Sequence, residues 1–153
     1  MSLIYRTASE KDVAILQDLG MAAYGRLKNQ MTPANWEKMR ESITSKENIP
    51  KLITIGFGFV CEKNHHIVGM AFLVPSGNPN QTYSKKTSYI RMVGVHPDAG
   101  GKGIAQNLTR LCLEKAKALG EKTISLHSAQ VMYAARYIYE KLGFQPIRPL
   151  DAH

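Results

Sequence analysis

Long hydrophobic runs are absent from this chain, and cysteine and acidic residues are scarce. The 153 residues include two cysteines and 12 acidic residues, against 20 basic ones. The longest apolar run, residues 67–74, is far too short to span a bilayer, and the N-terminus lacks the basic-then-apolar pattern of a signal peptide. We therefore expect a cytoplasmic protein with no membrane segment, in which Cys61 and Cys112 are buried free thiols.

Several familiar binding patterns are also missing. No His, Cys and carboxylate cluster has the spacing of a metal site, so we expect no metal. A P-loop would need a glycine at His96 and a hydroxyl residue at Gly103. A dinucleotide fingerprint would need a small residue at Gln106 and a second mononucleotide half, for which few residues remain. Internal repeats and linkers are absent too, so residues 1–153 are expected to form a single domain.

The most informative stretch combines a strand, a glycine-rich turn and an amphipathic helix. Residues 90–95 are rich in β-forming residues, and Pro97 then ends the strand. After the turn, apolar residues recur on one helical face, at Ile104, Leu108, Leu111, Cys112, Ala116 and Leu119. Free N–H groups and the positive dipole end at such a helix start suit a pyrophosphate, whereas a tight turn without a ligand is the alternative.

Two motifs, correctly ordered and spaced, resemble those of the GNAT superfamily of N-acetyltransferases. The pattern V-x-P-x-x-x-G-x-G-[I/L]-[G/A] of its acetyl-CoA-binding motif is present from Val95 to Ala105. About thirty residues later, Y-E-K-L-G-F begins at Tyr139, with Ala135 one turn earlier. The resemblance clearly covers residues 88–147, and the N-terminal half is similar in layout.

The resemblance implies an α/β (α+β) fold with a mixed, mostly antiparallel central sheet flanked by helices, its strands splayed at the acetyl-CoA site. It implies acetyl-CoA as the cosubstrate. The residues expected to contact it are Val93, Gly94, Val95, Gly100, Gly101, Lys102, Gly103, Ile104, Ala105 and Ala135. Two positions depart from the family pattern. Gly100 stands where Arg or Gln is common, so a side-chain contact is lost but a backbone N–H remains; Met132 stands where Asn is common, which puts one polar contact to coenzyme A, but not the fold, in doubt.

The implied chemistry is direct attack of a primary amine on the thioester. Tyr139 matches the tyrosine that acts as general acid in many members, and its ordinary pKa near ~10 exceeds that of a thiol, about 8.5. Its other interpretation is packing against the sheet. His127 lies where the ribosomal-protein N-terminal acetyltransferases have a glutamate base, and a neutral imidazole is a competent base. A histidine bonded to a backbone carbonyl, with a water relay as the base, is the alternative.

The expected partner is a small-molecule or peptide amine. The resemblance implies that the first two helices and nearby loops shape the site that binds it, with Tyr24, Arg26, Trp36 and residues 75–86 as neighbours. The net charge of +8 favours a polyanion, which coenzyme A satisfies. The basic residues are scattered and no nucleic-acid motif appears, which disfavours nucleic acid. A non-catalytic acyl-CoA-binding module of the same fold is the alternative function. Many relatives carry a further C-terminal strand, so either a shorter sheet or completion by a second subunit in a homodimer is expected.

Outside this stretch, periodicity and turn residues predict the remaining elements. Strands are expected at residues 3–7, 52–62, 67–74, 123–126 and 144–147, with a hairpin turn at residues 64–65. Helices are expected at residues 10–24, from residue 33 with Trp36, Met39 and Ile43 facing inward, and at residues 131–142. Residues 46–51 and 75–86 are predicted to be loops.

Overall fold

The structure is a computed structural model that describes residues 3–25, 27–79, 85–100 and 103–126. The helix predicted at residues 131–142 and the strand predicted at residues 144–147 lie outside these ranges.

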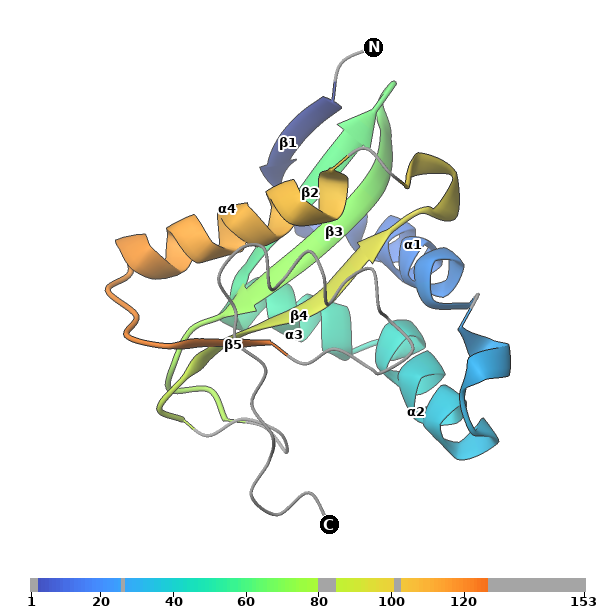
Figure 1. Cartoon of the computed structure of the whole chain (residues 1–153), viewed down its shortest axis with the longest axis horizontal. Coiled ribbons are helices and arrows are strands. Elements are labelled where there is room, and N and C mark those ends of the chain that lie inside the picture. The colour runs from blue at the N-terminus through green and yellow to red at the C-terminus, as the bar shows by residue number, and fades with distance from the viewer. Residues whose placement is uncertain (1–2, 26, 80–84, 101–102, 127–153) are drawn as a thin grey trace.

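A five-stranded mixed sheet forms the centre of the described chain (Figure 1). Its strands are β1 (Leu3–Thr7), β2 (Phe57–Lys63), β3 (His66–Val74), β4 (Ser88–Val95) and β5 (Ile124–Leu126), in the order β1-β2-β3-β4-β5. All neighbours pair antiparallel except β4 and β5, which are parallel. This confirms the mixed, mostly antiparallel sheet that the sequence predicts.

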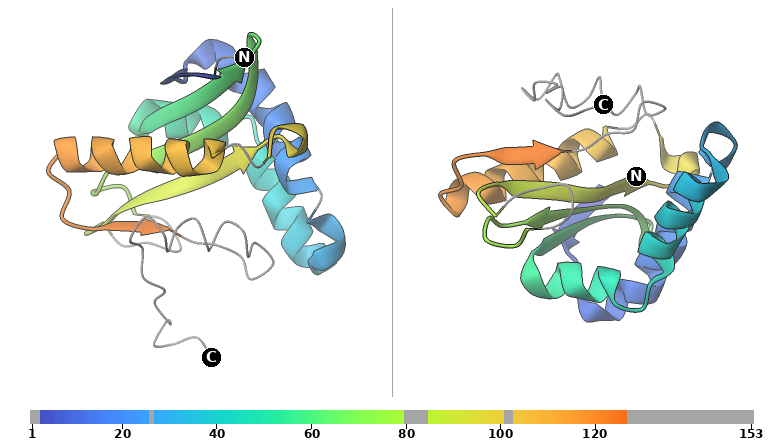
Figure 2. Two further views of the ribbon diagram at one scale, coloured as in Figure 1. Left: turned by 45° about the horizontal axis from the view of Figure 1, so that its top comes forward. Right: turned by 90° about the horizontal axis from the view of Figure 1, so that it is seen from below.

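Helices cover both faces of the sheet unequally (Figure 2). On one face, which we call the α4 face, the long helix α4 (Ile104–Ala118) is the only helix among the described residues. Three shorter helices lie on the opposite side: α1 (Val13–Gly25), α2 (Pro33–Thr44) and α3 (Asn48–Ile55). We call this the three-helix face. Its helices α1 and α3 share a buried cluster with β2, β3 and β4, and α2 packs against α1.

The predicted loop at residues 46–51 and the start of the predicted strand at residues 52–62 are wrong, because α3 occupies residues 48–55. The alternation of Ile55, Phe57, Phe59 and Cys61 predicts a strand from residue 52, but Ile49 and Leu52 are buried one helical turn apart against the three-helix face. Pro50 stands in the first turn of α3, where its missing N–H costs no helical bond. Gly56 ends the helix where a Cβ would lie 2.3 Å from the Leu73 carbonyl oxygen, so β2 starts only at residue 57.

Other local predictions are confirmed. Pro33 begins α2, and the Thr32 hydroxyl accepts a hydrogen bond from the Asn35 N–H at 3.1 Å. Asn64 and His65 form the hairpin turn with positive φ of 53° and 68°. On α4 the apolar face is buried as predicted at Ile104, Leu108, Cys112 and Ala116, but Leu119 lies beyond the last helical residue and is 43% exposed.

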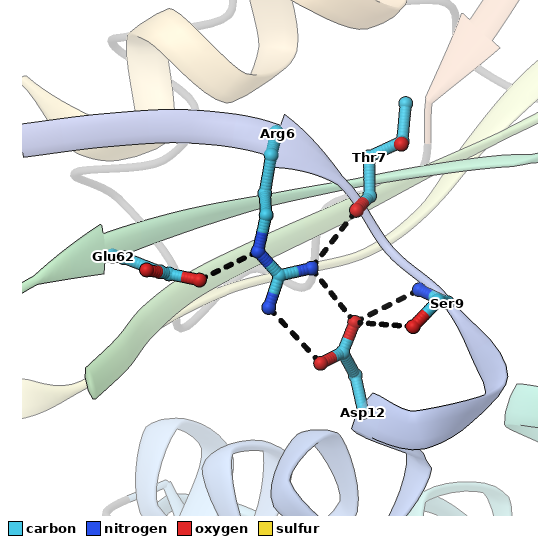
Figure 3. A network of polar contacts seen from close by, with 5 residues as sticks. All are labelled: Arg6, Thr7, Ser9, Asp12 and Glu62. Carbon is cyan, nitrogen blue, oxygen red and sulfur yellow. Dashed lines mark hydrogen bonds and ion pairs between the residues drawn. The ribbon is translucent and has the colours of Figure 1, made fainter. Parts of the chain in front are cut away.

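A charged network fixes the N-terminal strand to the rest of the fold (Figure 3). The Arg6 guanidinium donates to both oxygens of Asp12, at 2.9 and 3.0 Å, and to Glu62 Oε2 at 2.5 Å. The Ser9 N–H donates to Asp12 Oδ2 at 2.8 Å, and a short 3₁₀ turn, Glu10–Asp12, leads into α1 at Val13. The Arg6 charge holds the pKa of the Asp12 carboxyl below its usual range. The contribution of this pair to stability is therefore present at neutral pH and is lost as the pH falls through the lowered pKa.

Both cysteines are buried free thiols, as predicted. Cys61 lies in β2 and Cys112 in α4, and both belong to the core of the α4 face. Burial raises the pKa of the Cys112 thiol to about 12. Among the described residues, no helix is long and apolar enough to cross a bilayer.

Candidate active site

The strand β4 has two halves with different neighbours. Its first residues pair with β5, joining Ser88 to Ile124 and Ile90 to Leu126. Within the described residues, the rest of β4, from Arg91 to Val95, has no strand partner on this side. This open edge is where the sequence predicts that the strands splay.

A β-bulge interrupts the pairing of this half of β4 with β3, on its other edge. On β3, Met70 pairs with Gly94 whereas Phe72 pairs with Arg91, so β4 contains one extra residue between them. Met92 accommodates it with a φ of +55°, which is uncommon for a residue other than glycine. The bulge therefore changes the direction of the backbone next to Val93 and Gly94.

The helix α1 holds the bulge from the three-helix face. The buried Tyr24 hydroxyl donates a hydrogen bond of 2.6 Å to the Val93 carbonyl oxygen. A Cβ on Gly94 would lie 3.3 Å from Ala23 Cβ and 3.5 Å from Tyr24 Cε2, so glycine here allows α1 to pack closely. The sequence places Tyr24 near the acceptor, but the bond to the bulge was not predicted.

The glycine-rich turn joins β4 to α4, and its two described glycines have few neighbours. His96 and a 3₁₀ turn, Pro97–Ala99, come first, and the Asp98 N–H donates to His96 Nδ1 at 3.1 Å. Gly103 then caps α4 in the left-handed region, with φ +72°. Among the described residues, no atom lies within 4 Å of a Cβ built on Gly103, and one built on Gly100 meets only the Pro97 carbonyl, at 3.6 Å.

The start of α4 offers backbone donors beside this open space. Its first intrahelical bond runs from the Asn107 N–H to the Gly103 carbonyl at 3.0 Å, so the N–H groups before Asn107 have no partner within the helix. The helix start is pressed onto β3, because a Cβ on Gly69 would lie 2.7 Å from Ile104 Cγ2 and 2.9 Å from Leu108 Cδ1. Tight packing below and open space at the turn suit an anion held at the helix N-terminus.

The structure brings together the bulge and the turn, which carry seven of the predicted cofactor residues: Val93, Gly94, Val95, Gly100, Gly103, Ile104 and Ala105. The other predicted site residues, Gly101, Lys102, His127, Ala135 and Tyr139, lie outside the described residues, as does Arg26. Their roles stay predictions. No group of His, Cys, Asp and Glu that could hold a metal ion occurs among the described residues.

One charged residue near the bulge has no role predicted from the sequence: Arg91, which lies half-buried in β4 directly before it. A charged residue within a strand that is otherwise apolar is the signal that could have identified it, because such residues are rarely buried without a role.

Solved structures of similar fold cover nearly the whole chain. A predicted acetyltransferase with acetyl-CoA from Clostridium acetobutylicum is 22% identical, with TM-score 0.70, over 95% of this chain and 92% of that one. The PaiA N-acetyltransferase from Thermoplasma acidophilum in complex with coenzyme A is 16% identical, with TM-score 0.78, over 95% and 91%. An N-acetyltransferase from Staphylococcus aureus Mu50 is 26% identical, with TM-score 0.71, over 95% and 84%. No curated protein matches this sequence.

A family model gives the assignment directly. The acetyltransferase (GNAT) family matches residues 25–144, which include β2 to β5, the bulge, the glycine-rich turn and α4. The order of the strands, the glycine at the start of α4 and the fold of the solved relatives agree with this match. The chain belongs to the acetyltransferase (GNAT) family.

Proposed function

We propose that this protein is an acetyl-CoA-dependent N-acetyltransferase that moves an acetyl group to a primary amine. The observation that carries the proposal is the open, left-handed Gly103 turn at the start of α4, next to the unpaired edge of β4. The family match and the solved relatives with acetyl-CoA or coenzyme A support it.

The turn fits the pyrophosphate of coenzyme A. A Cβ on Gly103 would enter the open space over the turn, so glycine leaves the backbone accessible to a phosphate. We assign the backbone N–H groups from Gly100 through Gly103, including Lys102, and those of Ile104 and Ala105 to this contact, where the positive end of the α4 dipole adds to them.

The open edge of β4 fits the pantetheine arm and the thioester. Backbone groups of Val93, Gly94 and Val95 lie along the strand edge that has no partner among the described residues. A fixed N–H donor at this edge would stabilise negative charge on the carbonyl oxygen during the attack. The bond from Tyr24 keeps the bulge, and therefore this edge, in one geometry. We assign Ala135 to a contact with coenzyme A from the last helix.

The transfer needs two proton movements by side chains of this chain. Acetyl-CoA supplies an activated carbonyl and a thiolate leaving group. We assign His127 as the base that accepts a proton from the acceptor amine, and Tyr139 as the acid that returns one to the leaving sulfur. A pH–rate profile in which His127→Ala keeps the acidic limb of the wild type would exclude the base role and leave a water relay.

The proposed function is tested by acceptor-dependent release of free thiol from acetyl-CoA over a panel of polyamines, aminoglycosides, amino acids and peptides. With a productive acceptor, Tyr139→Phe should lower turnover by about 10²–10⁴-fold, because it removes a positioned acid and keeps the ring. The affinity for acetyl-CoA should stay nearly unchanged, since the phosphates are bound elsewhere.

The alternative, a non-catalytic acyl-CoA-binding module, gives the opposite result in the same assay. Such a module would bind acetyl-CoA in a calorimeter and release no thiol with any acceptor. Wild-type turnover in Tyr139→Phe, under conditions where chemistry limits the rate, would show that Tyr139 is a packing residue.

A further inference from the structure

Arg91 brings a positive charge to the three-helix face of the sheet. Its neighbour on β3 is Phe72, which is fully buried in the core of that face, and cross-strand partners share a face. The Arg91 side chain is half-buried. Part of the Arg91 side chain is therefore held out of water beside the core shared by α1 and α3.

Among the described residues, the Arg91 side chain forms no ion pair or hydrogen bond. The carboxylates in described ion pairs are held by other side chains: Asp12 and Glu62 by Arg6, Glu37 by Arg40, and Asp98 by His96. Partly burying a charge without a partner costs free energy. An anion that arrives with a ligand would offset this cost.

The surroundings of Arg91 connect it to the candidate active site. It directly follows Ile90, the last β4 residue paired with β5, and directly precedes Met92 in the bulge. Val93, whose carbonyl oxygen accepts the Tyr24 bond, follows two residues further along, across the bulge. Arg91 therefore lies at the point where the edge of β4 becomes open, on the face opposite α4.

Tyr89 lies two residues before Arg91 on the same face of β4, where burial raises the pKa of its hydroxyl and the positive charge of Arg91 acts in the opposite direction. The Tyr89 hydroxyl donates to the Asn78 carbonyl oxygen at 3.1 Å, which ties the first residues of the loop after β3 to this strand.

We propose that Arg91 determines acceptor specificity by binding an anionic group of the acceptor, so that the substrate is an amine that also carries a carboxylate. This inference rests on the proposed N-acetyltransferase function. A guanidinium presents a planar fork that binds both oxygens of a carboxylate, which an ammonium group cannot reproduce. The acceptor would place its carboxylate on Arg91 and its amine near the β4 bulge.

The experiment compares amines that differ only in one negative charge: glycine with glycinamide, β-alanine with β-alaninamide, glutamate with glutamine, and dipeptides that begin with aspartate or asparagine. Steady-state thiol release gives kcat and KM for each member with the wild type, Arg91→Gln and Arg91→Lys. Lys117→Gln is the charge-matched control, because Lys117 is exposed in the last turn of α4. Calorimetry with acetyl-CoA is run on every variant.

The wild type should prefer the anionic member of at least one pair. Arg91→Gln should reduce this preference by about 10- to 100-fold, through KM of the acceptor rather than kcat, as expected for a lost charged hydrogen bond. Arg91→Lys should recover part of it, and Lys117→Gln should keep it. The affinity for acetyl-CoA should be the same in all four proteins.

Three results would overturn the inference: a wild type that acetylates no anionic member, one that prefers the neutral members, or an Arg91→Gln variant that keeps the preference. Each leaves the proposed function intact if acetyl-CoA binds and any amine is acetylated. If acetyl-CoA does not bind the wild type, or if no amine is acetylated, the proposed function is overturned, and the inference with it.

Discussion

The two faces of the sheet are built in different ways. Among the described residues, the α4 face is covered by one long helix, and its core consists of apolar side chains and two thiols, with the buried Thr109 hydroxyl bonded to the Ala105 carbonyl oxygen of the same helix. The three-helix face is covered by three shorter helices, and polar groups reach into it: the Tyr24 hydroxyl on the bulge and the half-buried Arg91. The glycine-rich turn belongs to the first face, whereas α1 holds the bulge from the second.

This difference suggests a division of work between the faces. In the function that we propose, the α4 face would present backbone groups to acetyl-CoA, whose structure is constant. The three-helix face would present side chains to the acceptor, and these could be exchanged without disturbing α4. We therefore expect substitutions on the α4 face to affect cosubstrate binding and stability, and those on the three-helix face to affect turnover and acceptor choice.

The largest effect is expected at the two ends of α4. Gly103 and Gly120 both have positive φ, +72° and +80°, and no atom within 4 Å of a built Cβ among the described residues. Both Gly103→Val and Gly120→Val should be destabilised similarly, because a β-branched residue is strained there. Only Gly103→Val should weaken acetyl-CoA binding, by about 10- to 100-fold in calorimetry, since charged hydrogen bonds at the helix start are lost. Equal affinity for acetyl-CoA in the two variants would show that the turn does not bind the cosubstrate.

The next effect concerns packing beneath α4. Gly69→Val should lower the free energy of unfolding by about 1–3 kcal/mol, because the new side chain overlaps Ile104 and Leu108. Gly94→Ala is the matched change on the three-helix face, where the nearest atoms are 3.3–3.5 Å away, and it should cost less than about 1 kcal/mol. Chemical denaturation measures the free energy of unfolding of both variants. A larger decrease in Gly94→Ala than in Gly69→Val would contradict the prediction.

The smallest effect is expected at Tyr24. Tyr24→Phe keeps the ring but removes the bond to the Val93 carbonyl, so the free energy of unfolding should fall by about 1–2 kcal/mol. If the bond positions the bulge for catalysis, kcat should fall several-fold while KM for acetyl-CoA changes little. Loss of stability with unchanged kcat would limit Tyr24 to a structural role.

The sequence predicts the α4 face better than the three-helix face, for a physical reason. The strand, turn and helix from Ile90 to Ala116 carry long, regular periodicity and local turn chemistry, so neighbours in sequence determine them. The short helix α3 was missed because its Ile and Thr residues favour strands, and only packing against the sheet decides between the two structures. The hydrogen bond from Tyr24 to Val93 joins residues 69 positions apart, so no local sequence pattern predicts it.

Because both thiols are buried, their reactivity reports whether the protein is folded. Cys61 and Cys112 are the two cysteines of the chain, and both have no exposed surface. Burial raises the pKa of both thiols, so little reactive thiolate forms near neutral pH while the chain is folded. A disulfide reagent should therefore leave the native protein unmodified and label both cysteines as soon as a substitution opens the core. One chromogenic reagent can thus distinguish a variant that has lost its chemistry from one that has lost its structure.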